Sequence, residues 1–169
     1  GTVVTLSGNA SGTGALTKTG EGVLLLTGDM AHTGGTTIAA GMLAIGDGGL
    51  TGTLAGNVVN DSILLINRGG MINLDGNISG IGKLVKESPG TLVLSGTNSY
   101  TDQTLVVAGT LLVNGNQSAA TGPTFVLPGA SLGGTGVIGG DVWMNIGSNL
   151  NPGDGAGTLT INGNLTLYP

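Results

Sequence analysis

An ungapped internal repeat constrains the fold of this chain more than any other feature of its sequence. Residues 8–48 align with residues 76–116 at an offset of 68 residues, and 16 of the 41 aligned positions are identical. The identical residues are mainly glycines and leucines, so the two copies share a pattern of turns and buried positions. Repetition of this kind is typical of a solenoid, in which each unit packs only against its neighbours.

Short alternating aliphatic stretches recur through the chain. Alternation over three to five residues, bounded by Gly, Asn, Asp or Ser, predicts short strands with one buried face, and no stretch shows helical periodicity. The stretches begin at steps of 19, 21, 28 and 19 residues, at Leu24, Leu43, Leu64, Leu92 and Leu111. The sequence therefore predicts an all-β fold, a β-helix (β-solenoid) of about seven to eight coils over residues 1–169, with three coils of about 23 residues in each 68-residue offset.

The composition agrees with this architecture. Gly accounts for 36 of the 169 residues, and aromatic residues for only 2%. Glycine suits tight corners between short strands, and a core of stacked coils forms an aliphatic column with little room for rings. We expect the inward side chains of each coil to stack on their equivalents in the next; examples are Leu24, Leu26, Leu43 and Ile45.

Charge and hydropathy exclude several classes of function. The net charge is −5, and the four cations, Lys18, Arg68, Lys83 and Lys86, form no basic stripe, so no nucleic-acid partner is predicted. No apolar run reaches the roughly 18 to 20 residues needed to span a bilayer, and no export signal opens the chain. The chain has no Cys, which excludes a disulfide framework. Its abrupt ends lead us to expect a segment of a longer protein.

One glycine motif resembles a nucleotide-binding fingerprint. The stretch "GTGVIGG" places Gly134, Gly136 and Gly139 in the spacing GxGxxG. That fingerprint requires a following helix whose N-terminus faces the pyrophosphate, whereas the next residues include Gly147 and Pro152 and show no helical face. We therefore interpret the motif as a glycine-rich corner of a coil.

A second motif, "GASLG", places Ser131 at the centre of a GxSxG nucleophile elbow. A catalytic serine needs a histidine base, and in this motif the histidine follows the serine. The one histidine, His32, precedes it and aligns with Tyr100 in the second repeat copy. We interpret His32 as a structural residue and Ser131 as a corner residue.

The remaining candidate motifs are incomplete. Lys83 in "GIGKL" mimics the end of a P-loop, but Asn77 stands where the first glycine belongs and Leu84 where Ser or Thr belongs. Calcium-binding β-rolls have an Asp in each repeat of nine residues, and the acidic residues of this chain lie too far apart for that spacing. These residues include Asp29, Asp47, Asp61, Asp75, Glu87, Asp102, Asp141 and Asp154. We predict no catalytic, cofactor-binding or metal-binding residue and no small-molecule substrate.

The repeat resembles the passenger-associated repeat of bacterial autotransporters. The resemblance is carried by "GNISGIGKLVKESPGTLVLSGTNSYTDQTLVVAGTLLVNG", residues 76–115, and by the degenerate copy that begins at Gly8. Residues 132–167 resemble the segment near the C-terminal end of such passengers. "MAHTGG" in the first copy and "DQT" after Tyr100 depart from the family pattern at turns.

The resemblance implies a right-handed parallel β-helix that is exported by type V secretion. It also implies display at the cell surface or in the extracellular space, tethered to or released from the bacterial outer membrane. The implied partner is the protein's own C-terminal outer-membrane β-barrel, outside this chain. Residues 124–167 are expected to be an autochaperone-like portion.

The resulting hypothesis is a non-enzymatic one. The chain is expected to be a stalk and folding nucleus of an adhesin or virulence factor, which contacts a host surface or another bacterial cell. The alternative is a fragment of a β-helix enzyme that degrades polysaccharide, although no two acids lie two residues apart along a predicted strand. Three rings, of Phe125, Trp143 and Tyr168, lie late in the chain, so residues 124–167 are expected to be the most stable section and to fold first.

Overall fold

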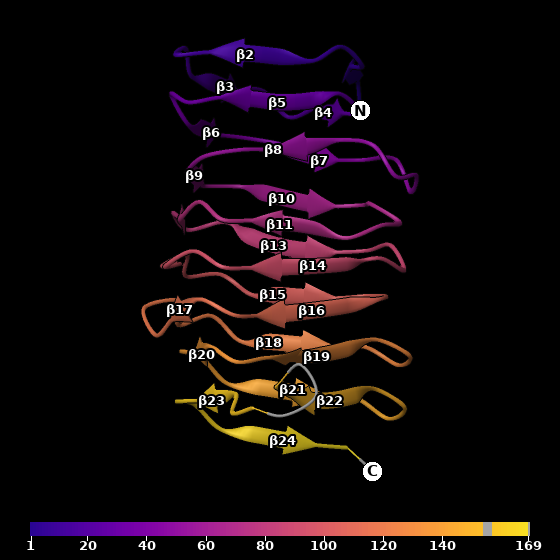
Figure 1. Ribbon diagram of the computed structural model, residues 1–169, viewed down its shortest axis with the longest axis vertical. Helices are drawn as coiled ribbons and strands as arrows, with labels where there is room; N and C mark the ends of the chain where they lie inside the picture. The colour runs from indigo at the N-terminus through magenta and orange to yellow at the C-terminus, as the bar shows by residue number, and fades with distance from the viewer. Residues whose placement is uncertain (154–156, 169) are drawn as a thin grey trace.

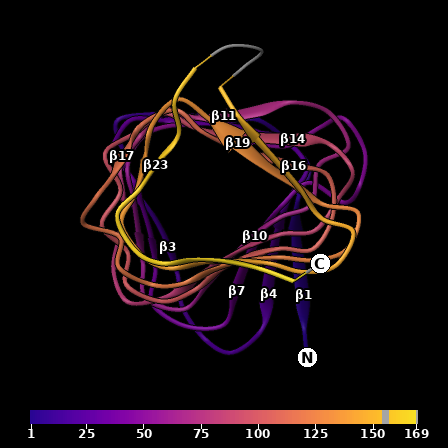
Figure 2. The same ribbon diagram turned by 90° about the horizontal axis from the view of Figure 1, so that it is seen from below.

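The computed structural model describes residues 1–153 and 157–168, which wind into a parallel β-solenoid of about eight turns. The coils stack along one axis, with the N-terminus at one end and the C-terminus at the other (Figure 1). Viewed along that axis, they superpose into one closed outline (Figure 2). All pairings between named strands are parallel; they build three faces, which the chain visits in the same order in every coil. The predicted all-β solenoid is confirmed, and its right-handed winding stays a prediction.

The first face is a single nine-stranded sheet, here called the long sheet, that runs the length of the described solenoid. Each coil contributes one strand of three or four residues to it. The strands, in spatial order, are β1 (Val3–Leu6), β4 (Val23–Leu26), β7 (Met42–Ile45), β10 (Ile63–Ile66), β13 (Lys83–Lys86), β15 (Thr104–Val106), β18 (Thr124–Val126), β21 (Val142–Met144) and β24 (Leu165–Leu167).

The second face is divided into two sheets. The N-terminal sheet holds β2 (Ala10–Gly12), β5 (Asp29–His32) and β8 (Thr53–Leu54). The other sheet continues this face with β11 (Ile72–Leu74), β14 (Thr91–Leu94), β16 (Thr110–Val113), β19 (Ser131–Gly134) and β22 (Asn149–Pro152).

The third face is also divided. Its first sheet consists of β3 (Leu16–Lys18), β6 (Thr36–Ile38), β9 (Val58–Asn60) and β12 (Ile78–Ser79). Its second sheet consists of β17 (Asn116–Gln117), β20 (Val137–Ile138) and β23 (Thr160–Ile161). Between the two sheets, residues 97–100 cross this face without forming a strand.

The core is the aliphatic column that the sequence predicts. In the long sheet Leu24 is in register with Leu43, and Leu26 with Ile45. Leu26, Leu43 and Ile45 are fully buried, and Leu24 is nearly so. Stacking of equivalent side chains therefore buries two inward rows in the long sheet with few aromatic residues.

The predicted coil length is wrong, and the error changes the placement of the repeat. Successive strands of the long sheet are aligned at steps close to 20 residues, as in Leu64 to Leu84 to Thr104. The 68-residue offset therefore equals three coils plus one face. Leu24 lies in β4 of the long sheet, whereas its repeat equivalent, Leu92, lies in β14 of the second face.

Stacked glycines form one corner of the solenoid and explain the glycine content. A Cβ on Gly76 would overlap the carbonyl oxygen of Gly56, and a Cβ on Gly96 would overlap that of Gly76. The same holds for Gly115 above Gly96 and for Gly136 above Gly115. Successive backbones approach too closely here for any side chain. Gly136 belongs to "GTGVIGG", so the interpretation of that motif as a coil corner is consistent with the structure.

Candidate functional site

The two buried lysines have equivalent surroundings in the two repeat copies. Lys18, at the end of β3, donates through Nζ to the carbonyl oxygens of Thr19 at 2.9 Å, Gly20 at 2.5 Å and Ala40 at 3.0 Å. In each copy the lysine bonds the carbonyl two residues ahead and the one 22 residues ahead, in the next coil. The ammonium group therefore joins the corners of successive coils.

Lys86 repeats this arrangement at the end of β13. It donates to the carbonyl oxygens of Ser88 and, at 3.2 Å, Ala108. Its side chain is fully buried, and desolvation lowers its pKa to about 8. The ammonium contacts backbone carbonyls at a sealed corner, so its role there is to satisfy them rather than to meet a substrate. Neither lysine was predicted to have a role, although the identity of Lys18 and Lys86 in the two repeat copies was a usable signal.

A ring and a threonine form a second contact that both copies share. His32 Nε2 lies 3.0 Å from Thr36 Oγ1, and Tyr100 Oη lies 2.7 Å from Thr104 Oγ1. Both rings are buried, and desolvation raises the pKa of Tyr100 to about 12. A phenol fills the position of the imidazole, so the geometry agrees with a structural role for His32.

The structure does not bring the nucleophile-like serine to the histidine. Ser131 opens β19, in the seventh coil, whereas His32 ends β5, in the second. The backbone N–H of Ser131 bonds Gly109 O at 2.8 Å within the stacked sheet, so the residue is in a strand and not at a strand-to-helix elbow.

The other candidate side chains are likewise dispersed. Lys83 opens β13 after Gly82, whose added Cβ would overlap the Ser62 carbonyl oxygen of the preceding coil. The described residues contain no group of three or more His, Asp or Glu side chains placed to hold a metal ion. Asp154 lies outside the described residues.

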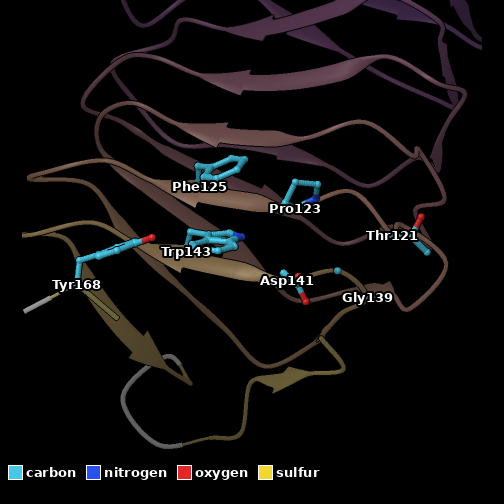
Figure 3. A pocket seen from close by; sticks show the side chains of 8 residues that line it. Thr121, Pro123, Phe125, Gly139, Asp141, Trp143 and Tyr168 are labelled. Carbon is cyan, nitrogen blue, oxygen red and sulfur yellow. The ribbon is translucent and has the colours of Figure 1, made fainter. Parts of the chain in front are cut away.

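Three aromatic rings form a ladder on the outer surface of the last coils. Phe125 in β18 is in register with Trp143 in β21, and their ring centroids lie 6.2 Å apart. Tyr168, just after β24, stacks on Trp143 at 6.1 Å. The rings point outward from the long sheet (Figure 3), and Tyr168 is 47% exposed. They therefore contribute little to the solenoid core.

An open groove of about 580 Å³ lies beside this ladder. Among the described residues that line it, Asp141 provides the one carboxylate. Its Oδ1 accepts hydrogen bonds from Asn164, through the backbone N–H at 2.7 Å and the side-chain amide at 3.2 Å. Glycoside hydrolysis needs a second carboxylate across the bond that breaks. The groove offers apolar and stacking contact, and its carboxylate holds the next coil in place.

In the part of the chain that the structure describes, no helix is long and apolar enough to cross a membrane.

Comparisons with known proteins identify the repeat. The profile of the passenger-associated-transport-repeat family matches residues 16–45 and 84–113, which lie inside the two copies. A stretch of 76 residues is 53% identical to the "Adhesin BmaC autotransporter" of Brucella suis biovar 1 (strain 1330). That alignment covers 45% of this chain and 2% of the relative, so the chain spans a small fraction of that protein. No solved structure matches.

The matched segments show how the family's repeat is used. Residues 16–45 run from β3 to β7 and contain Lys18, His32 and Thr36. Residues 84–113 run from within β13 to β16 and contain the equivalent Lys86, Tyr100 and Thr104. Repeat, solenoid fold and homologue agree: the chain is part of an autotransporter passenger, a β-solenoid with passenger-associated transport repeats that is homologous to an adhesin autotransporter.

Proposed function

We propose that this chain is a stalk segment and folding nucleus of an adhesin passenger displayed on the bacterial surface. The observation that carries the proposal is the continuity of the long sheet, which pairs every coil from β1 to β24 with its neighbours. The relative's size, of which this chain covers 2%, supports a role as one segment of a much longer passenger. The protein's translocator domain then lies elsewhere in the parent chain.

Three kinds of bond between coils support the stalk role. The backbone ladder of the long sheet joins each coil to the next, and the sheets of the other two faces add further ladders over part of the length. At the corners, side-chain oxygens accept hydrogen bonds from backbone N–H groups of the following coil. Asn57 Oδ1 accepts from the N–H of Asn77 at 2.9 Å, and Asn77 Oδ1 accepts from the N–H of Thr97 at 2.8 Å. The buried ammonium groups of Lys18 and Lys86 add a third connection. A rod joined in this way holds whatever lies beyond it at a fixed distance from the membrane.

The aromatic ladder supports the folding role of residues 124–167. A solenoid can begin to fold wherever its coil and interface terms are most favourable. Stacked rings contribute about 0.5–1.5 kcal/mol per pair beyond their area burial, and two such pairs lie in the last coils. Earlier coils then add to the exposed strand edge of this nucleus. The passenger is expected to meet a host surface or another bacterial cell through parts of the parent protein.

Trp143→Ala in the parent passenger tests the folding role. The matched control is Leu25→Ala, which shortens an outward side chain in the same row of the long sheet in the second coil. We expect Trp143→Ala to reduce the amount of passenger at the cell surface several-fold and Leu25→Ala to leave it near the wild-type level. Hydrogen exchange on the purified chain is expected to show the slowest amides around Trp143 and faster exchange in residues 1–50. Equal secretion of both variants, with the slowest amides in the first repeat copy, contradicts the proposed nucleus.

A further inference from the structure

The long sheet is apolar on its outer surface as well as in the core. Its strands were expected to bury one face, yet the outward position at the centre of each strand is also apolar through seven consecutive strands. This outward row consists of Leu25, Ala44, Leu65, Val85, Leu105, Phe125 and Trp143. The equivalent outward row on the third face is more polar, with Thr17, Thr37, Val59 and Ser79.

Such a sheet differs from the usual half-buried one. A parallel sheet whose strands are apolar on both faces is typically covered on both sides, and a contiguous exposed apolar patch marks a binding surface. Six of the seven side chains in the outward row are only half-buried; Ala44 is buried. The outer surface of the long sheet is therefore an interaction surface, and the charges beside it indicate the partner.

A balanced pair of charges lies at the middle of this surface. The strand β13 is the fifth of the nine strands. Lys83 and Val85 are its outward residues, and the exposed Glu87 follows directly after the strand ends. At about 3.3 Å per residue, Lys83 and Glu87 lie roughly 13 Å apart along the strand, too far to pair with each other. Three outward rows run along the sheet, one through Lys83, one through Val85 and one through Glu87. Between β4 and β21, the one further charged residue in these rows is Asp141.

We propose that the outer surface of the long sheet binds the same surface of a second copy of this chain, side by side and pointing in the same direction. A two-fold axis parallel to the solenoid axis places each coil opposite the same coil of the second copy and reverses the order of the rows. Lys83 then faces Glu87 of the second copy, Glu87 faces its Lys83, and the two Val85 side chains meet between these pairs.

The opposite orientation does not fit the charges. A two-fold axis along the strands reverses the order of the coils and keeps the order of the rows. Because β13 is the central strand, Lys83 would then face Lys83 and Glu87 would face Glu87. Like charges placed opposite each other disfavour a complex. The parallel orientation is also the one available to two neighbouring stalks anchored in one membrane.

The surface has the size of a weak interface. Eight strand spacings of about 4.8 Å and a strand width of about 13 Å give an area of roughly 500 Å² on each copy. Stable complexes bury about 800 Å² per partner, so we expect association only at high local concentration. Anchoring many copies in one membrane provides that concentration.

Charge-reversal variants of the purified chain test the proposal by sedimentation velocity over a concentration series. We expect Lys83→Glu and Glu87→Lys each to weaken dimerisation about tenfold, since each converts two attractive pairs into repulsive ones. The double variant, Lys83→Glu with Glu87→Lys, restores complementarity and is expected to dimerise like wild type. Glu21→Lys makes the same charge change as Glu87→Lys at an exposed corner and serves as the control.

A second pair of variants tests the apolar row. Leu65→Asp is expected to abolish dimerisation, whereas Thr37→Asp, in the outward row of the third face, is expected to leave it unchanged. A wild-type chain that stays monomeric at about 1 mM overturns the proposal. So does a double charge variant that remains monomeric. Binding of lipid vesicles or of glycan through Leu65 and Trp143 by a monomeric chain would assign the surface to that other partner. The outcome does not depend on the secretion experiment above.

Discussion

The two repeat copies share a sequence pattern but lie on different faces of the solenoid. In the first copy, β3 and β6 lie on the third face, and β4 and β7 lie in the long sheet. The equivalents of β3 and β6 in the second copy are β13 and β15, which lie in the long sheet. The equivalents of β4 and β7 are β14 and β16, which lie on the second face. Each strand of the repeat has moved forward by one face.

The contacts at the corners move with the repeat. In both copies the lysine bonds carbonyls two and 22 residues ahead, and the ring bonds the threonine four residues ahead. The pattern therefore encodes a corner flanked by two short strands, and all three faces of the solenoid accept it. In this chain the two units are therefore not in phase with the coils.

The repeated glycines Gly41 and Gly109 provide the test with the largest expected effect. Both have positive φ, +70° and +72°. A Cβ on Gly41 would lie 2.5 Å from the carbonyl oxygens of Gly20 and Gly22, and one on Gly109 would lie 2.6 Å from that of Ser88. We expect Gly41→Ala and Gly109→Ala each to lower the free energy of unfolding by about 3 kcal/mol, as measured by urea denaturation.

The control for these variants is Gly129→Ala. Gly129 has a φ of +81°, but an added Cβ would meet nothing within 4 Å. We expect a loss of about 1 kcal/mol, from backbone strain alone. Equal losses in all three variants would show that the close approach at the repeated corner has no energetic weight.

Removing the buried ammonium groups tests the second shared contact. Lys18→Met and Lys86→Met keep the aliphatic stem but leave the corner carbonyls without a donor. We expect each to lower the free energy of unfolding by about 1–3 kcal/mol. Lys83→Met removes an outward ammonium and is expected to change stability by less than about 0.5 kcal/mol. A stabilised Lys86→Met variant would mean that the cost of burying the charge exceeds the value of its hydrogen bonds.

Exchanging the rings between the copies tests whether the ring position is equivalent on both faces. We expect His32→Tyr to be nearly neutral, since Tyr100 makes the same contact. Tyr100→Phe is expected to lower the free energy of unfolding by about 1 kcal/mol, because Thr104 Oγ1 loses its partner. Thermal unfolding monitored by circular dichroism measures both. A large loss in His32→Tyr, with no loss in Tyr100→Phe, would separate the two positions.

The pH dependence of stability tests the two buried titratable groups. Between pH 8 and 10.5 the unfolded chain holds a proton on Lys86 that the folded chain has released, so stability from this group rises with pH. Between pH 10 and 12 the folded chain retains the Tyr100 proton that the unfolded chain loses, so stability from this group falls. Lys86→Met is expected to remove the rise, and Tyr100→Phe to remove the fall. Unchanged profiles in both variants contradict these assignments.

The all-β solenoid, its aliphatic column and its glycine corners could be predicted, because strand alternation and turn residues are local properties. The phase of the repeat was missed, although the 28-residue step from Leu64 to Leu92 equals one coil plus one face. Burial of Lys18 and Lys86 could not be predicted, because the carbonyls that receive them come from the next coil. The outward position of Trp143 depends on register, which a single strand of three residues does not define.

The position of cysteine pairs gives the most direct test of the claim that each coil has about 20 residues and that the repeat advances by one face. The chain has no Cys, so introduced pairs are unambiguous. Val85 is in register with Leu105 on the long sheet, and Thr17, the repeat equivalent of Val85, is in register with Thr37 on the third face. We expect oxidation to cross-link both V85C/L105C and T17C/T37C, and to leave V85C/A108C, the pair that coils of about 23 residues would align, unlinked. Cross-linking of V85C/A108C in place of V85C/L105C would contradict the account.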